Sequence, residues 1–225
     1  MLTNKKKVLY ITLLSMCILI VSSFSIFFFY HDHNNKYVSN DKIKLSNGKI
    51  FNLVDQPFLG KKDAKNIIVE FSDYRCPWCG KFQKDMYPLI KQRLVKTGKA
   101  KFYYVNLTVL GPNSYKAANA AAYIYKHYPE HFFKFHDILF SYQKNEKKNW
   151  VTDKLLLNVA KKSIPNLNEN KFIGSIKNKE YMNQIKSLDS KITKIGIRVT
   201  PTLIVNGKVS NPFEYKSIQN KLITE

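Results

Sequence analysis

The sequence contains little cysteine and almost no arginine. Only three of its 225 residues are cysteine. Cys17 lies in an apolar N-terminal stretch, so the rest of the chain holds a single pair, Cys76 and Cys79. One pair excludes the framework of several disulfides that stabilises many small secreted domains. A pair kept alone in an oxidising compartment is either one small structural disulfide or a redox centre.

Arginine is scarce although the chain is strongly basic, with a formal net charge of +21. Only Arg75, Arg93 and Arg198 stand among 37 basic residues, and the lysines are spread along the whole sequence. Planar recognition of phosphate and guanine favours arginine over lysine. The charge therefore predicts a well-solvated surface and no nucleic-acid partner. Weak attraction to an anionic membrane surface or cell wall stays open.

The N-terminus has the pattern of a membrane anchor. Lys5–Lys7 precede an uncharged stretch from Val8 to Tyr30, and its length matches the roughly 20 residues that a helix needs to cross a bilayer. A cleaved signal peptide is the alternative, but its apolar core should span about 7 to 15 residues and end in small residues. We expect residues 1–30 to form a cytoplasmic tip and one transmembrane helix. The lysines then place the rest of the chain outside the cytoplasm.

Residues 31–49 are polar and lack a sustained hydrophobic period, which predicts a tether between the anchor and a folded domain. The remaining residues, 50–225, are numerous enough for one sizeable core, so we expect a single domain there. His31 and His33 are potential metal ligands without further partners in the pattern. We therefore predict no metal site at these residues.

A crossover of strand, helix and strand surrounds the cysteine pair. Ile67–Phe71 is an apolar run interrupted only by Glu70, which is typical of a central strand buried on both faces. The cysteine motif follows, then a helical pattern to Leu94 that Pro88 should kink. Because Lys101–Val105 predicts the next strand, the two strands are expected to be parallel.

The stretch from about residue 112 to 195 is helical in character. Its last part has an apolar face with spacings of four and three residues. This face consists of Tyr181, Ile185, Leu188, Ile192 and Ile195. Thr202–Val205 predicts a return to strand, and Asn206-Gly207 predicts a tight hairpin turn. The chain is therefore predicted to be an α/β protein with a helical insertion.

The chemistry of the chain is expected at Cys76-Pro77-Trp78-Cys79. At a helix start the first sulfur faces unsatisfied backbone N–H groups, which favour its thiolate, and Pro77 fits the first helical turn. A helix terminus supplies about 0.3 to 2 kcal/mol, whereas each pKa unit corresponds to about 1.36 kcal/mol. Direct hydrogen bonds must therefore supply the rest of any large shift. This geometry makes Cys76 the attacking thiol and Cys79 the resolving thiol.

Metal binding and a structural disulfide are the alternatives to redox exchange. A structural zinc site needs four ligands, and no second pair of suitable spacing occurs. Copper transfer would use a soft third ligand, but Met86 lies about two helical turns beyond Cys79. Redox exchange is therefore favoured, and no metal or separate cofactor is predicted.

Three stretches of the sequence resemble the DsbA-like thiol-disulfide oxidoreductases, particularly their membrane-anchored forms from single-membrane bacteria. They are Gly60–Ala64, Ile68–Cys79 and Gly196–Thr202, with Asn206-Gly207 shortly after the last. The resemblance covers both ends of the predicted domain and leaves the helical insertion between them. It implies a thioredoxin-like fold with a helical insertion, preceded by one N-terminal transmembrane helix.

The resemblance also implies roles for residues outside the cysteine motif. Pro201 should be cis and lie beside the cysteines, so that the Thr200 backbone pairs with an extended substrate segment. Pro77 and Trp78 should contact the same segment. Glu70 matches the buried acid of the family, which would pass a proton to or from Cys79. Two alternatives stay open: Pro201 as a trans residue at a sheet edge, and Glu70 as an acid that reaches solvent at a strand end.

The function that the resemblance implies is disulfide donation. The Cys76–Cys79 disulfide would oxidise secreted or membrane proteins, and a quinone-linked, DsbB-like (BdbC-like) membrane oxidase would restore it. Trp78 departs from the strongly oxidising members, which carry a histidine there, because it has no positive charge to stabilise a thiolate. The same motif also permits a reductase or isomerase. A redox-inert module that binds peptides or metal is the alternative from a different class.

Overall fold

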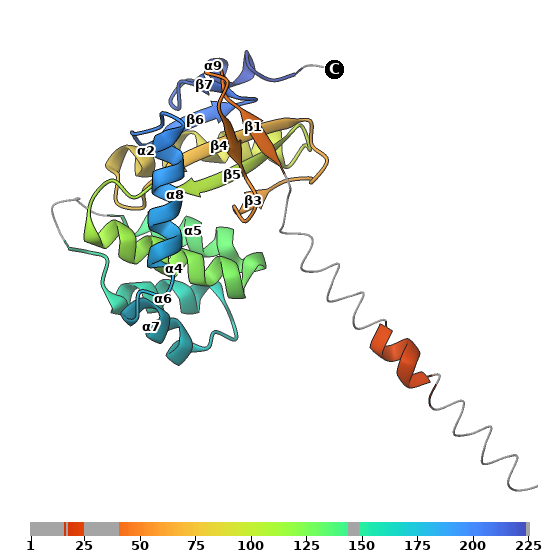
Figure 1. Ribbon diagram of the computed structural model, residues 1–225, viewed down its shortest axis with the longest axis vertical. Helices are drawn as coiled ribbons and strands as arrows, with labels where there is room; N and C mark the ends of the chain where they lie inside the picture. The colour runs from red at the N-terminus through yellow and green to blue at the C-terminus, as the bar shows by residue number, and fades with distance from the viewer. Residues whose placement is uncertain (1–15, 17, 25–40, 144–148, 224–225) are drawn as a thin grey trace, which may run out of the picture. The chain divides into compact units, whose positions relative to one another are not determined.

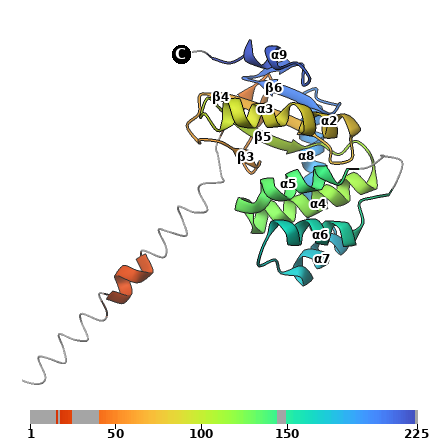
Figure 2. The same ribbon diagram turned by 180° about the vertical axis from the view of Figure 1, so that it is seen from behind.

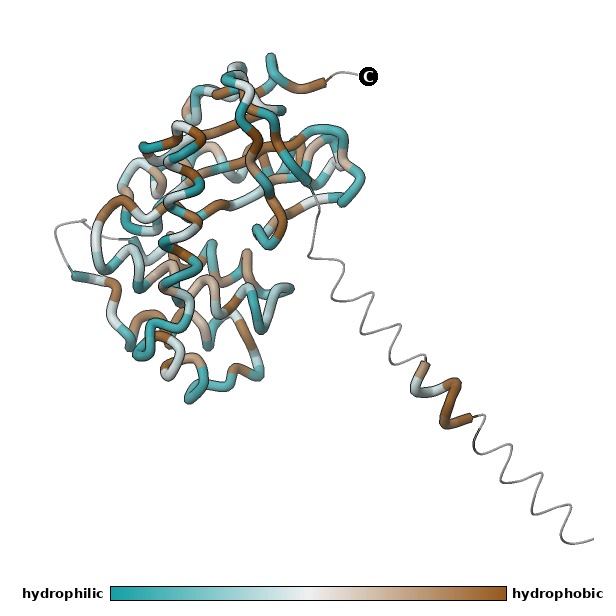
Figure 3. Tube along the Cα trace, in the orientation of Figure 1, coloured by the Kyte–Doolittle hydropathy of each residue, from teal (hydrophilic) through white to brown (hydrophobic). Residues whose placement is uncertain are grey.

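The computed structural model describes residues 16, 18–24, 41–143 and 149–223. It divides into two units, residues 1–38 and 39–225. In the first unit, residues 18–24 are helical and largely hydrophobic (Figure 3). The side chains of Ile18 and Leu19 are exposed. No helix within the described residues is both long and apolar enough to cross a membrane. Most of the predicted anchor, residues 1–30, lies outside these residues, as do residues 31–40 of the predicted tether.

A five-stranded sheet organises the second unit, in the order β3-β5-β4-β6-β7 (Figure 1). Its strands are Phe58–Leu59 (β3), Asn66–Ser72 (β4), Ala100–Asn106 (β5), Thr202–Val205 (β6) and Lys208–Ser210 (β7). The central strand β4 runs parallel to β5 and antiparallel to β6. The predicted parallel crossover is therefore confirmed, and the thioredoxin-like sheet is present.

The crossover from β4 to β5 is one interrupted helix. It consists of α2 (Pro77–Asp85), α3 (Tyr87–Ile90) and the π-helical turn η1 (Lys91–Val95). The break falls at Met86, where Pro88 occupies the first turn of α3, as its missing N–H and ring sterics require. Figure 2 shows α2 and α3 lying across one face of the sheet.

Strand alternation gives the two faces of β4 different neighbours. Ile68 belongs to the larger core, which includes residues of α2, α3 and the inserted helices. Val69 and Phe71 belong to a second core that includes Ile192 of α8. Glu70 has the same parity as Ile68 and therefore faces α2. The predicted double burial of this strand is confirmed.

The helices α4 to α8 form the insertion between β5 and β6 (Figures 1 and 2). Their bounds are Pro112–His127 (α4), Pro129–His131 (η2), Phe132–Ser141 (α5), Asp153–Ser163 (α6), Glu169–Lys177 (α7) and Met182–Lys194 (α8), and Tyr215–Gln219 (α9) follows the sheet. The insertion contributes many buried residues to the larger core, and α8 also contributes Ile192 to the second core before the chain returns to the sheet.

The structure corrects the predicted tether, residues 31–49, because residues 41–49 are folded. Lys42–Lys44 (β1) and Ile50–Asn52 (β2) form an antiparallel hairpin. Ile43 and Leu45 are buried in the second core. Only two apolar residues, Ile43 and Leu45, alternate with lysines in this segment. Its polar composition therefore did not indicate a strand. The folded domain therefore begins before residue 50.

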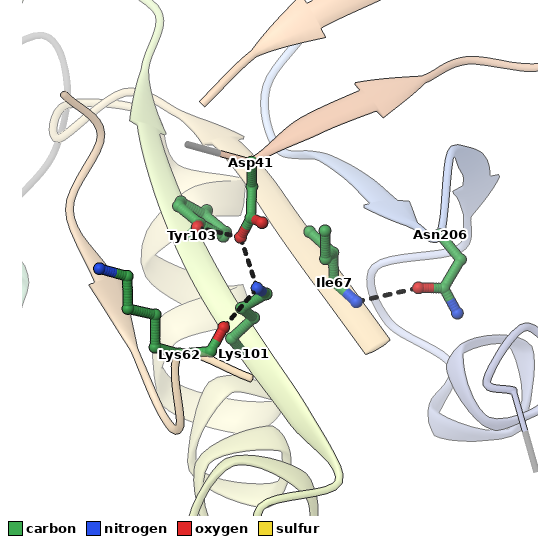
Figure 4. Close-up of polar contacts among 6 residues, drawn as sticks. All are labelled: Asp41, Lys62, Ile67, Lys101, Tyr103 and Asn206. Carbon is green, nitrogen blue, oxygen red and sulfur yellow. Dashed lines mark hydrogen bonds and ion pairs between the residues drawn. The ribbon is translucent and has the colours of Figure 1, made fainter. Parts of the chain in front are cut away.

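Buried polar contacts fix this hairpin and the last strands (Figure 4). Asp41 accepts a hydrogen bond from Tyr103 at 2.5 Å and pairs with the buried Lys101 at 2.6 Å. Asn206, at the tip of the β6–β7 hairpin, accepts from the backbone N–H of Ile67 at 2.9 Å. Asn206 and Gly207 both have positive φ, as the predicted tight turn requires.

Candidate active site at the start of helix α2

The two cysteines lie where β4 passes into α2. Cys76 is the N-cap of α2 with extended backbone, and Pro77 occupies the first turn. Cys79 lies one turn further in and is completely buried, whereas Cys76 retains 6% of its accessible surface. Both residues carry free thiols. Cys76 is thus the outer and Cys79 the inner of the two sulfurs.

The loop before β6 meets the cysteines although it is distant in sequence. The Thr200–Pro201 peptide bond is cis. The Cys76 thiol donates to the Thr200 carbonyl oxygen, with 3.4 Å between sulfur and oxygen. The structure therefore brings together the two stretches that the sequence singled out separately, and Pro201 is not a trans edge residue.

Hydrogen bonds make Cys76 acidic. Its pKa falls from 9.0 to about 6, chiefly because the Cys79 thiol hydrogen-bonds to its sulfur. Burial opposes the shift, while the Thr200 side chain and the backbone N–H groups of Cys79 and Trp78 add to it. The Thr200 carbonyl accepts only from the protonated thiol and also opposes the shift. The donors outweigh it, as expected if the helix terminus alone is insufficient.

Cys79 is shifted in the opposite direction. Burial raises its pKa well above the ordinary value, and the hydrogen bond to Cys76 and the charge of Glu70 raise it further. One sulfur is thus a thiolate near neutral pH while the other keeps its proton. Neighbouring titratable groups with opposed shifts are typical of sites that transfer protons and electron pairs.

Glu70 lies beneath this pair and has no exposed surface. Burial raises its pKa from 4.5 to about 8, against the opposing effect of hydrogen bonds from Ser72 and Gln83. The Gln83 side-chain N–H donates to Glu70 Oε2 at 2.7 Å. Among the described residues, Oε1 has no hydrogen bond of normal geometry. The alternative in which Glu70 reaches solvent at the strand end does not hold.

Comparison with known proteins agrees with this geometry. The family model described as Thioredoxin matches residues 52–223. A disulfide bond formation protein D from Bacillus subtilis is 34% identical over 171 residues, which cover 76% of this chain and 77% of the relative. A probable disulfide bond formation protein D from Bacillus anthracis is 30% identical over 188 residues, covering 84% and 86%. The chain belongs to the DsbA-like thiol-disulfide oxidoreductases.

Solved structures of this family superpose on the domain. The oxidised BdbD crystal structure from Bacillus subtilis gives a TM-score of 0.72 at 31% identity and covers 81% of this chain and 95% of that chain. DsbA from Chlamydia trachomatis gives a TM-score of 0.66 at 25% identity, covering 73% and 88%. The resemblance inferred from the motifs is confirmed, and the protein is a BdbD homologue.

The sequence did not indicate how this DsbA-like enzyme braces the thiol-bearing turn. The Gln143 side-chain N–H donates to the carbonyl oxygens of Tyr74 and Cys76 at 2.9 and 2.8 Å. A Cβ at Gly80 would lie 1.8 Å from Gln143 Oε1, so the glycine after Cys79 permits this approach. Asp73 also holds this turn, because it accepts hydrogen bonds from the backbone N–H groups of Arg75, Val109 and Leu110.

Exposed apolar side chains surround the DsbA-like site. Trp78 is 59% exposed, and its ring meets Phe213 edge-on with 5.8 Å between centroids. Val199, next to Thr200, is 68% exposed. Large exposed apolar groups beside a reactive sulfur indicate a surface that contacts another molecule.

Proposed function

We propose that this thiol-disulfide oxidoreductase donates its Cys76–Cys79 disulfide to reduced cysteines of secreted or membrane proteins outside the cytoplasm. The observation that carries the proposal is the lowered pKa of Cys76, about 6. A stabilised thiolate stabilises the reduced enzyme and is a good leaving group, and both effects favour transfer of the disulfide to the client. The names of the curated relatives, disulfide bond formation proteins, support the same direction.

Donation takes two exchange steps. A client thiolate attacks the Cys76 sulfur, the bond to Cys79 breaks, and the released Cys79 sulfur takes a proton from neutral Glu70. A second client thiolate then attacks the client sulfur of the mixed disulfide and releases Cys76 as thiolate. The client is oxidised by two electrons, the enzyme disulfide is reduced, and Glu70 regains its proton from solvent.

Reoxidation reverses the order through a membrane partner of the quinone-linked, DsbB-like (BdbC-like) class. The Cys76 thiolate attacks the partner's disulfide, and ionised Glu70 accepts the Cys79 proton. The Cys79 thiolate then closes the enzyme disulfide and releases the partner reduced. A pKa near 8 suits both directions, since Glu70 is mostly protonated at pH 7 while an ionised fraction remains available.

Client contact is assigned to the surface around the outer sulfur. Thr200 and Pro201 offer backbone to an extended segment, while Pro77 and Trp78, both exposed, follow Cys76 in the chain. Because Trp78 has no charge, its contribution is apolar contact rather than thiolate stabilisation. The lowered pKa of Cys76 is accounted for without a cation at residue 78.

The activity is tested with the purified domain and a reduced two-cysteine peptide. We expect stoichiometric peptide oxidation by the disulfide form, and thiolate absorbance of the reduced form with a midpoint near pH 6. Equilibration with glutathione gives the potential and separates an oxidase from a reductase. A Cys76 midpoint near 9 together with no peptide oxidation would contradict the proposal.

The location of the site is tested separately. Lys5–Lys7 and the uncharged stretch Val8–Tyr30 motivate a single-pass membrane protein with its domain outside. After mild reduction of intact cells, an impermeant thiol reagent should label Cys76. A Cys76→Ser variant is the control, since Cys79 is fully buried. Labelling that appears only after lysis would refute this orientation.

A further inference from the structure

A chain of hydrogen bonds joins the buried acid to the helical insertion. Gln83 of α2 donates through Nε2 to Glu70 Oε2 at 2.7 Å. The Oε1 atom of Gln83 lies 3.2 Å from His136 Nε2 of α5. His136 Nδ1 lies 3.3 Å from the hydroxyl of Tyr74, in the turn before Cys76. Of the residues joined by these hydrogen bonds, the proposed proton transfer uses only Glu70. It gives no role to Gln83, His136 or Tyr74.

The donors in this series of hydrogen bonds all point toward Glu70. His136 is completely buried among aromatic rings, and burial together with the charge of Lys91 lowers its pKa to about 3. It therefore carries a single ring proton at neutral pH. Because Gln83 uses its N–H group on Glu70, its oxygen must accept, which places the ring proton on His136 Nε2. The Tyr74 hydroxyl then donates to His136 Nδ1, so each donor points toward Glu70.

We propose that Gln83 and His136 are positioning residues that fix which oxygen of Glu70 carries its exchangeable proton. An oxygen that accepts an N–H group is a poor site for a proton, so neutral Glu70 holds its proton on Oε1. In the described part of the chain Oε1 makes no other hydrogen bond of normal geometry. The Ser72 side chain interacts with both Glu70 and Cys79, and the charge of Glu70 acts on Cys79. We therefore assign proton exchange with the Cys79 sulfur to Oε1, the oxygen that Gln83 does not use. This inference rests on the role proposed for Glu70 and assigns the insertion a part in it.

Other titratable groups face Glu70 from every element packed against it. They are Cys76 and Cys79 from the start of α2, Tyr74 from the preceding turn, Tyr87 from α3 and Tyr104 from β5. Burial raises the pKa of all three tyrosines, which therefore stay neutral. Lys91 and Asp137 form an ion pair next to this group. Of the two thiols and Glu70, Cys76 and Glu70 are thus expected to titrate between pH 5 and 9, whereas the pKa of Cys79 lies well above its ordinary value of 9.0.

The measured quantity is the pH dependence of reoxidation of the reduced full-length protein by glutathione disulfide. The rate first rises near pH 6 with ionisation of the attacking Cys76, and a second rising limb near pH 8 follows ionisation of Glu70, which must accept the Cys79 proton. The midpoint of this second rising limb is the quantity compared among variants. Gln83→Leu removes the N–H group that favours the carboxylate, so the midpoint should rise by about one pH unit, the shift expected for loss of one hydrogen bond to a charged group. His136→Phe should shift it in the same direction, because Gln83 is then free to turn.

Two variants separate positioning from general damage. His136→Gln keeps an N–H donor near the place of Nε2 and should restore the wild-type midpoint. Gln92→Leu changes an exposed glutamine of η1 and should leave the profile unchanged. In all variants the thiolate titration of Cys76 should stay near pH 6, because Gln83 and His136 act on Glu70, which exchanges its proton with Cys79 and not with Cys76.

The outcomes distinguish this inference from the function on which it rests. If Glu70→Gln abolishes the second rising limb while Gln83→Leu and His136→Phe leave its midpoint in place, the positioning role is wrong and the role of Glu70 stands. If Glu70→Gln itself keeps the limb, the proposed proton transfer fails as well. Equal shifts in His136→Phe and His136→Gln would show a packing effect and overturn the assignment.

Discussion

A Cys79→Ser variant is expected to accumulate in mixed disulfides with other proteins. The Cys76 thiolate of this variant attacks an oxidised client or partner and forms the bond as usual. The inner thiol that would open the bond from within is missing, so the complex persists. A serine hydroxyl can donate to the Cys76 sulfur in place of the Cys79 thiol, which chiefly lowers the Cys76 pKa, so the attacking thiolate stays abundant at neutral pH. Non-reducing electrophoresis after rapid alkylation should show at least about tenfold more adducts than in wild type.

The matched control is Cys76→Ser, which keeps the other cysteine. Cys79 has no exposed surface, and burial raises its pKa well above the ordinary value. It should therefore form few adducts, and the double variant should form none. Equal trapping by the two single variants would remove the assignment of an outer and an inner thiol.

Local sequence predicted the parts of the site that depend on local physics. The run around Ile68 requires burial on both faces, and a cysteine pair with Pro77 between its members fits the first turn of a helix. Together they predict a strand, a thiol-bearing turn and a helix in that order. Contact between Cys76 and Thr200, 124 residues apart, followed only from resemblance to a family.

Other parts of the site depend on tertiary contacts that leave no local pattern. Gln143 is one glutamine two residues beyond the end of α5, and only the fold shows that it binds the carbonyl oxygens of Tyr74 and Cys76. His136 stands within an aromatic stretch whose pattern predicts packing alone. A single glycine such as Gly80 is only a weak indication, in the sequence, that another side chain packs closely against the backbone. The two-residue alternation of Ile43 and Leu45 was likewise too short to outweigh the lysines around it.

Glu70→Gln is expected to stabilise the fold while it slows turnover. The folded-state pKa of Glu70, about 8, lies above its ordinary value of 4.5. Protonated Glu70 therefore stabilises the fold fully below pH 4.5, and this contribution is lost as the pH rises through 8. Since each pKa unit corresponds to about 1.36 kcal/mol, keeping this acid buried costs roughly 3 kcal/mol at pH 7. Glutamine does not ionise and avoids that cost.

The free energy of unfolding, measured with urea for both reduced proteins, tests the stability effect. At pH 4 the two proteins should unfold at similar urea concentrations, and the advantage of the variant should grow steadily up to pH 8. Glu214→Gln, a change at an exposed acid before α9, is the control and should follow the wild-type curve. Parallel curves for wild type and Glu70→Gln would contradict burial as the cause of the raised pKa.

Turnover of Glu70→Gln should be slower than that of wild type although the variant is more stable, because it has lost the group that carries the proton. In donation, the released Cys79 sulfur has no acid to protonate it. In reoxidation, the Cys79 thiol has no base to remove its proton, and its own raised pKa leaves almost no thiolate at pH 7. We expect peptide oxidation and glutathione-dependent reoxidation to slow about tenfold or more at pH 7, while the Cys76 titration stays near 6. A more stable protein with an unchanged exchange profile would leave Glu70 as a costly structural residue with no part in proton transfer.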